Sequence, residues 1–428
     1  MELKVLGAGR EVGRSGFILE AGEHFLLDYG VKLTPKNTEY PLDIKTNIKA
    51  MILSHAHLDH SGYLPHFYER SHCINYMTSP TLDISKILWM DSMKIASHER
   101  TKPPFTKQDC QKTEKFSFPI KYKQRMEIAK GIELEFFDAG HILGSAMTKI
   151  THKNKSFLYT GDFNPDDTRL FTGADLNVGK VDYLVTESTY GNSNHPKRSE
   201  SESQFIDFIN ETVSQGGTAL VPALAVGRAQ EMIDILYEHR KKLQAQVFFD
   251  GMGQAVAKHF LEYPEYLRDP KFLGKALHSV KWVQNFERKK VTKEPCIIVT
   301  SSGMLQGGPS VFYLKKLYPD KRNCVALTCF QVPGTAGRTL LDEGVMHFEK
   351  DTAKVDTVKV NAAFKRFDFS SHADKKALMK SLKKWSPEKI VCVHGDTKII
   401  DDFIVAVKED LGIKAVGPKM GEIIKFGD

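Results

Sequence analysis

Cysteine is scarce in this sequence, with six residues among 428, and no two of the six form a C-x-x-C pair. Scattered cysteines in so long a chain argue against a disulfide scaffold and for a reducing compartment, and the missing C-x-x-C spacing disfavours a closed structural zinc site. No apolar run approaches the roughly 20 residues that span a bilayer. Residues 1–7 also lack the apolar stretch of a secretion signal. We therefore expect a cytoplasmic protein with no membrane-spanning segment.

The bulk composition permits several domains and excludes few functions. The length allows two or three domains with a large core, and 41% hydrophobic and 26% charged residues are typical of a soluble globular protein. The net charge of +7 permits an anionic partner without requiring one. Basic clusters at residues 239–242, 288–290 and 380–384 are more typical of solvated helix faces than of a nucleic-acid surface.

Histidine and aspartate, by contrast, are concentrated in one short segment. Residues 54–60 contain His55, His57, Asp59 and His60, and imidazole and carboxylate are preferred zinc donors. Two histidines spaced by two, followed by an adjacent Asp-His pair, offer two donor sets that point in different directions. This arrangement suits two neighbouring metal ions. The segment follows the apolar residues 49–53, which read as a buried strand, so the donors are expected on a loop at a strand's carboxyl end.

The same pattern recurs along the chain: an apolar strand, then an acidic or imidazole residue at its tip. Repetition of this kind assembles an active site along one edge of a sheet. Residues 62–115, by contrast, read as helical. The residues at strand tips are Asp28, His141, Asp162, Glu187 and His394. We expect Asp28 to orient one of the metal-binding side chains without binding the metal itself.

The middle of the chain differs from both ends in its pattern of predicted helices and strands. Residues 200–345 alternate between predicted helices and strands, as in an α/β domain with a parallel sheet. The last eighty residues return to the pattern of the first part of the chain, in which an apolar strand is followed by a polar residue at its tip. We therefore predict one domain built from residues 1–194 and 351–428, interrupted by a domain of residues 195–350. Glycine-rich loops after the last two strands of the insertion could offer backbone N–H groups to phosphate, and plain turns explain them equally well.

These residues, in this order, resemble the metallo-β-lactamase fold, an αββα sandwich with a dinuclear site on one edge. Glu187 in residues 187–190, His372 in residues 371–374 and His394 in residues 393–396 are similar to three motifs of the β-CASP nucleases. Residues 302–309 and 334–338 resemble loops of the inserted α/β β-CASP domain. The resemblance covers essentially the whole chain and is closest to the archaeal cleavage-and-polyadenylation-factor-like and RNase J-like ribonucleases.

The resemblance implies a role for each of these residues. His55, His57 and His141 would bind one Zn²⁺, Asp59, His60 and His394 a second, and Asp162 both. The two ions would share a hydroxide that attacks phosphorus. His372, held and charged by Glu187, would supply the proton that the leaving sugar oxygen needs. Asp59, Glu187 and His372 are thus the residues that we expect to take part in catalysis.

The resemblance also bears on the substrate. DNA-acting members usually carry valine at the last motif and RNA-acting members histidine, so His394 favours RNA. A groove between the two domains would admit single-stranded RNA and exclude a duplex. Residues 364–367 either stack bases and meet phosphates or alternate between core and surface. A homodimer is one option for the assembly. The candidate RNA contacts are Ser302, Gly303, Gly334, Arg338, Lys365 and Arg366.

Other classes of function would use the same metal donors. A small-molecule hydrolase, such as a thioesterase or lactonase, would need neither Glu187, His372 nor the large insertion. A DNA-directed β-CASP nuclease and a metal-free RNA-binding scaffold are further alternatives. A flavin-linked di-iron oxidoreductase has glutamate where this chain has His57. Endonuclease and 5′→3′ exonuclease activity both remain open.

Overall fold

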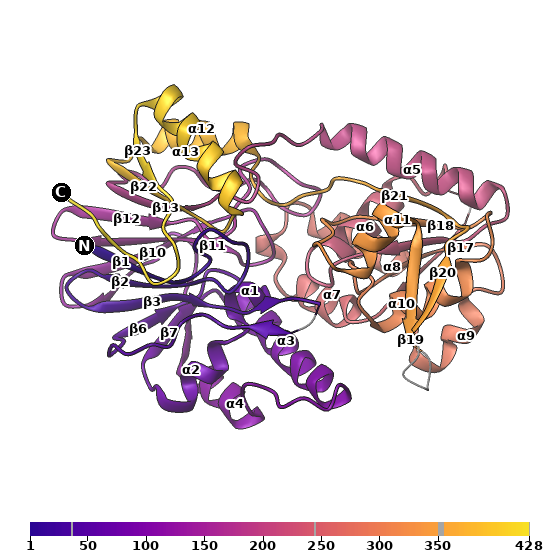
Figure 1. The fold of residues 1–428 in the computed structure, drawn as a ribbon, viewed down its shortest axis with the longest axis horizontal. Coiled ribbons are helices and arrows are strands. Elements are labelled where there is room, and N and C mark those ends of the chain that lie inside the picture. The colour runs from indigo at the N-terminus through magenta and orange to yellow at the C-terminus, as the bar shows by residue number, and fades with distance from the viewer. Residues whose placement is uncertain (36, 244, 350–354, 428) are drawn as a thin grey trace. The chain divides into compact units, whose positions relative to one another are not determined.

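The chain folds into two units. A computed structural model describes residues 1–35, 37–243, 245–349 and 355–427. The first unit combines Met1–Asn194 with Ser371–Asp428, and the second is His195–Ser370. Both ends of the chain therefore belong to one unit, and the indigo and yellow segments of Figure 1 lie together in it. Among the described helices, none has both the length and the apolar character that crossing a membrane requires.

The first unit contains two sheets of seven strands. Each sheet joins an antiparallel half to a parallel half. In spatial order the first sheet comprises β24 (Ile423–Lys425), β1 (Glu2–Gly7), β2 (Gly16–Glu20), β3 (His24–Tyr29), β6 (Ala50–Ile52), β7 (Ile74–Met77) and β8 (Ser117–Pro119). The second comprises β23 (Lys414–Val416), β22 (Lys389–Val393), β13 (Tyr183–Glu187), β12 (Lys155–Tyr159), β11 (Ala146–His152), β10 (Ile132–Asp138) and β9 (Arg125–Ala129).

The two sheets pack face to face, with helices on both outer faces. The shared core includes Phe17 and Phe25 from the first sheet and Phe136 and Phe157 from the second, all fully buried. Strands covered on both faces are buried along their whole length, as β13 is, rather than on alternate residues. The fold is therefore the expected αββα sandwich. Its helices are α1 (Leu58–Ser61), α2 (Leu64–Arg70), α3 (Ser79–His98) and α4 (Lys107–Phe116) beside the first sheet, and α12 (Lys375–Trp385) and α13 (Thr397–Leu411) beside the second.

Strand direction decides where the polar strand tips meet. Strands β12, β13 and β22 are parallel neighbours, so their carboxyl ends share one edge of the second sheet. Strand β10 runs the same way, because two antiparallel pairings separate it from β12. In the first sheet β3 and β6 are also parallel. The loops that carry the predicted metal ligands follow the carboxyl ends of β6, β10, β12 and β22.

The second unit is built on a six-stranded sheet in which every pairing is parallel. The parallel α/β character predicted for the insertion is therefore confirmed. In spatial order its strands are β16 (Lys281–Trp282), β15 (Gln246–Asp250), β17 (Cys296–Thr300), β14 (Ala219–Pro222), β18 (Cys324–Leu327) and β21 (Ala363–Arg366). Its helices are α5 (Arg198–Ser214), α6 (Arg228–Glu238), α7 (Gly253–Glu262), α8 (Pro270–Ser279), α9 (Arg288–Val291), α10 (Gly308–Leu317) and α11 (Ala336–Glu343).

Two sequence predictions need correction. The stretch 62–115 is not all helical, because β7 lies between α2 and α3 and pairs with β6 and β8. The predicted boundary after residue 350 lies outside the described residues. Residues 355–370 group with the second unit, because β20 (Val355–Lys359) forms a hairpin with β19 (Val345–Glu349) and β21 extends the six-stranded sheet.

Candidate active site

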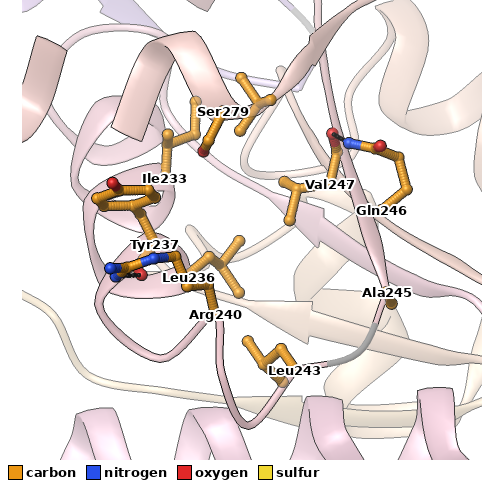
Figure 2. A pocket seen from close by; sticks show the side chains of 10 residues that line it. Ile233, Leu236, Tyr237, Arg240, Leu243, Ala245, Gln246, Val247 and Ser279 are labelled. Atoms are coloured by element: carbon orange, nitrogen blue, oxygen red, sulfur yellow. Dashed lines mark hydrogen bonds between the residues drawn. The ribbon is translucent and has the colours of Figure 1, made fainter. Parts of the chain in front are cut away.

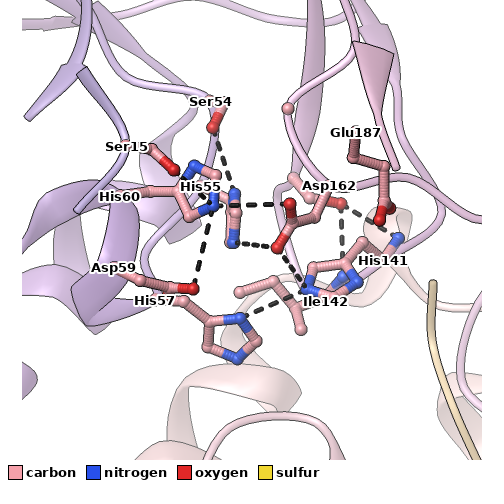
Figure 3. A network of polar contacts seen from close by, with 12 residues as sticks. Ser15, Ser54, His55, His57, Asp59, His60, His141, Ile142, Asp162 and Glu187 are labelled. Carbon is pink, nitrogen blue, oxygen red and sulfur yellow. Dashed lines mark hydrogen bonds and ion pairs between the residues drawn. The ribbon is translucent and has the colours of Figure 1, made fainter. Parts of the chain in front are cut away.

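The predicted metal ligands gather at the shared strand edge of the first unit (Figure 3). Two groups of donor atoms each lie within 4.8 Å of one another. They match the two sets expected from the sequence, with one residue common to both. The first group is His55, His57, His141 and Asp162, and the second is Asp59, His60, Asp162 and His394.

Asp162 connects the groups because its two carboxylate oxygens face different imidazoles. Its Oδ2 lies 3.6 Å from Nε2 of His55 and 3.8 Å from Nε2 of His141. Its Oδ1 lies 3.4 Å from Nε2 of His60 and 3.3 Å from Nδ1 of His394. One carboxylate therefore faces both donor groups.

The second group joins residues from opposite ends of the chain. Asp59 follows β6, and His394 follows β22. Oδ2 of Asp59 lies 3.3 Å from Nε2 of His394 and 4.0 Å from Nε2 of His60. These two segments can therefore contact a common ion.

The donor atoms fit metal ions better than they fit one another. Nε2 of His55, Nε2 of His57 and Oδ1 of Asp162 are buried and have no hydrogen-bond partner in the described part of the chain. Burial, together with neighbouring imidazoles, lowers the pKa of His55 and of His141 well below the ordinary value. A neutral imidazole presents the lone pair that a metal ion requires. Nitrogen-rich donor sets that share a carboxylate fit a bound metal ion.

Asp28 supports this site from behind, as its position at the end of β3 predicted. Its carboxylate is fully buried and lies 2.7 Å from Nδ1 of His60. The Ser54 hydroxyl and the Tyr159 hydroxyl each donate to the same oxygen, Oδ2, at 2.7 Å. The contact places the imidazole proton on Nδ1, so Nε2 of His60 is left to face Asp59 and Asp162. Sequence reasoning missed Tyr159, although it directly precedes the turn that carries Asp162.

The electrostatics of the centre follow from close packing of imidazoles and carboxylates. Burial by itself would lower the pKa of His60, but the carboxylates of Asp162 and Asp28 outweigh it and raise that pKa well above the ordinary value. Burial would raise the pKa of Asp162, but the imidazoles of His394 and His60 hold it well below its usual range. A cation bound at Nε2 of His60 would take the place of a proton.

Glu187 and His372 form a third group with Asp162. Nδ1 of His372 lies 2.9 Å from Oε2 and 3.1 Å from Oε1 of Glu187, and 4.0 Å from Oδ2 of Asp162. Burial opposes protonation, but Glu187 and Asp162 raise the pKa of His372 to about 9. The Glu187 carboxylate is itself held by the backbone N–H of Phe163. A charged, oriented imidazole therefore lies beside the metal ligands.

The backbone around these residues is tightly constrained. Asp28 and His394 both adopt left-handed conformations, with φ of 54° and 50°, which is uncommon outside glycine and concentrates at functional sites. A side chain at Gly395 would approach the carbonyl oxygen of Ser188 to 2.8 Å, so glycine allows the tips of β13 and β22 to meet. The backbone N–H of Ala373 donates to the carbonyl of Phe163 at 2.8 Å and holds the loop of His372 against that of Asp162.

The candidate RNA contacts all lie in the second unit, and they differ in exposure. Gly334, Arg338, Lys365 and Arg366 are exposed, Ser302 is half-buried and Gly303 is buried. The suggestion that residues 364–367 stack bases is wrong for one of them. Phe367 is 3% exposed and packs on the rings of Phe205 and Phe208.

A cavity of about 400 Å³ opens elsewhere in the second unit (Figure 2). It lies between the carboxyl end of α6 and the amino ends of β15 and β16. Ile233, Leu236 and Val247 line it, and the Arg240 guanidinium lies 4.1 Å from the centre of the Tyr237 ring. Its described lining contains none of the predicted metal ligands.

The αββα fold and the paired donor sets define a metallo-β-lactamase-fold hydrolase that depends on metal. Three domain families match the sequence. The metallo-beta-lactamase superfamily domain matches residues 18–189, the Beta-Casp domain residues 229–340, and the Zn-dependent metallo-hydrolase RNA specificity domain residues 357–418.

Similar proteins extend the match to the whole chain. The probable RNase MJ4 of Methanocaldococcus jannaschii is 37% identical over 100% of both chains. RNase aCSPSF2 of Saccharolobus solfataricus is 36% identical over 99% of this chain and 85% of that protein. The transcription termination factor FttA of Pyrococcus abyssi is 34% identical over 98% of this chain and 70% of its own length. The chain belongs to the β-CASP ribonucleases of the metallo-β-lactamase superfamily.

A crystal structure of a protein of unknown function from Enterococcus faecalis shares the fold. It covers 99% of both chains with a TM-score of 0.60 and 14% identity.

Proposed function

We propose that this chain uses two zinc ions to hydrolyse phosphodiester bonds of single-stranded RNA, in RNA processing or decay. The observation that carries the proposal is the placement of Asp162. Its two oxygens face two separate buried sets of donors, so one carboxylate serves both positions. Phosphodiester hydrolases with two metals use such a pair to act on both the attacking and the leaving oxygen.

Each donor set has a defined part in this mechanism. His55, His57 and His141 would hold the first ion, and Asp59, His60 and His394 the second. When bound, the pair supplies a nucleophilic water of lowered pKa and positive charge for the phosphate oxygens. Asp28 keeps the proton of His60 on Nδ1 and thereby holds Nε2 in the direction of the ligand position.

His372 would act as the general acid for the leaving sugar oxygen. Both carboxylate oxygens of Glu187 lie beside its Nδ1, so Nδ1–H is engaged and Nε2–H is the proton that can be transferred. The His372 side chain is 22% exposed, whereas that of Glu187 is 1% exposed. The imidazole can thus reach a bound substrate while the carboxylate stays behind it and orients it.

The relatives and the matched domains support RNA as the substrate. The RNA specificity domain spans residues 357–418, a stretch that includes both His372 and His394. Two of the similar proteins are named as RNases. A small-molecule hydrolase would have no use for the Glu187–His372 pair, which makes that alternative the weaker one. The homodimer and the cytoplasmic location stay predictions.

A cleavage assay with defined metal content tests the proposal. The purified chain, with zinc measured by elemental analysis, is incubated with matched linear and circular single-stranded RNAs and with a thioester. We expect two zinc ions per chain, cleavage of RNA that a chelator abolishes and zinc restores, and no thioester hydrolysis. Cutting of the circle would establish an internal mode, and a strict need for a 5′-monophosphate an exonucleolytic one. Thioester turnover without RNA cleavage would overturn the proposal.

A further inference from the structure

Three loops of the second unit meet at the carboxyl edge of its parallel sheet. They comprise residues 223–227 after β14, residues 301–307 after β17 and residues 328–335 after β18, and these strands are adjacent in the sheet. The connection from β14 leads past β17 to β15, whereas the connection from β17 leads past β14 to β18. Right-handed crossovers in opposite directions place their helices on opposite faces. Ligands of open α/β sheets bind outside the strand ends at such a reversal.

The loops are fixed to one another around Gly303. Its carbonyl oxygen accepts hydrogen bonds from Nε2 of Gln331 at 3.1 Å and from Sγ of Cys329 at 3.3 Å. A side chain at Gly303 would lie 2.8 Å from that Sγ and 2.9 Å from the backbone nitrogen of Leu224. The Thr328 hydroxyl donates to the carbonyl of Pro222 at 2.9 Å. Cys329 and Gln331, the two chain neighbours of residue 330, are thus both held by the carbonyl of Gly303.

Two large apolar side chains project from these fixed loops into solvent. Phe330 is 46% exposed and Leu224 is 37% exposed, although Gln331 next to Phe330 is 1% exposed. A half-exposed aromatic ring whose chain neighbours are fixed costs little conformational entropy to bind a planar ligand. This is the property that nucleobase-stacking residues share in proteins that bind single strands.

Positive charge lies at the same edge. Arg366 is the last residue of β21 and is paired with Leu327, the last residue of β18. Phe330 lies three positions after Leu327 in the loop that follows β18. Arg366 and Lys365 are exposed. A cation and a half-exposed aromatic ring on the same sheet edge match one phosphate and one base of a single strand.

We propose that Phe330 is a stacking platform for a nucleobase of the substrate RNA, and that Arg366 contacts a neighbouring phosphate. The platform rests on the proposed function. It acts on RNA binding and leaves the chemical step to the metal centre. It takes any base, with purines favoured because their rings overlap more of the phenyl face.

Phe330→Ala in the full, zinc-loaded chain tests the platform, and Phe286→Ala is the matched control. Phe286 is a 79% exposed phenylalanine of the same unit that lies outside the three loops. Initial rates are measured on oligo(A) and oligo(U). We expect Phe330→Ala to raise KM on oligo(A) about tenfold with kcat nearly unchanged, and to raise it less on oligo(U). Phe330→Tyr should restore KM, and Phe286→Ala should match the wild type.

The outcomes separate the platform from the proposed function. If the wild type cuts RNA and Phe330→Ala has the KM of Phe286→Ala, the platform is wrong and the ribonuclease stands. If the wild type cuts no RNA, the proposed function fails and the platform with it. If sedimentation shows that Phe330→Ala converts a dimer into a monomer, the patch belongs to a second copy of the chain and the platform is overturned.

Discussion

Replacing Asp28 with asparagine tests how the metal centre is held from behind. Four donors converge on this buried carboxylate: the backbone N–H and the hydroxyl of Ser54, the hydroxyl of Tyr159 and Nδ1 of His60, at 2.7–2.8 Å. Three of them share Oδ2. An asparagine has one oxygen and one NH₂ group, so in either orientation its NH₂ faces at least one donor.

The size of the effect follows from this mismatch. Losing a hydrogen bond to a charged group costs about 1.5–3 kcal/mol. Partners that orient a metal-binding histidine typically contribute about 10- to 100-fold in metal affinity. Because His60 belongs to the set with Asp59 and His394, we expect Asp28→Asn to lower the affinity of that set for its metal ion by this factor. The ion held by the other three histidines should be affected less.

A chelator titration followed by elemental analysis measures the two affinities. The matched control is Asp182→Asn, because Asp182 is also buried and also accepts a backbone N–H and a hydroxyl, both from Ser156. Asp182 precedes β13, at the strand end opposite Glu187. Both variants should lower Tm, and only Asp28→Asn should lose zinc. Equal zinc retention in the two variants would refute the reasoning.

Three further outcomes are expected. His372→Ala should keep its zinc but lose about 10²–10⁴ in cleavage rate, and a fully active variant would remove His372 from the mechanism. Asp162→Asn should lower the occupancy of both ions, which elemental analysis showing two metals per chain would contradict. Burial, with Asp175 nearby, raises the pKa of Asp138 from 3.8 to about 7. The stability that this raised pKa contributes is fully present below the ordinary value of 3.8 and is lost as the pH rises from there to about 7. Asp138→Asn should therefore gain more Tm over the wild type at about pH 8 than at about pH 4, and an equal gain at both would refute the assignment.

Much of the sandwich was readable from local patterns. The apolar segments that lead to Asp28 and Asp162 were predicted as strands and are β3 and β12. Their apolar character reflects burial between two layers, which is a property that the sequence carries locally. Strand β7 was missed, because four residues between two helices become a strand only through pairing with β6 and β8.

The site shows the same division. His55, His57, Asp59 and His60 lie within six positions, so their chemistry was visible at once. Tyr159 and Ser54 were not, because each acts on Asp28 and the hydroxyl of Tyr159 comes from 131 positions along the chain. The two alternatives left open for Phe367 have a related cause. Alternation along one strand cannot reveal that Phe205 and Phe208 of another element cover its ring.

By itself the sequence determined the kind of donor at each strand tip. Imidazole and carboxylate chemistry belongs to the residue, and the apolar segment that predicts the strand directly precedes that residue in the sequence. Only the tertiary structure decided which donors lie within reach of one another. Parallel directions in two packed sheets bring the tips from both ends of the chain to one edge. There the two oxygens of Asp162 turn toward different imidazoles, an orientation set by packing that no local pattern encodes.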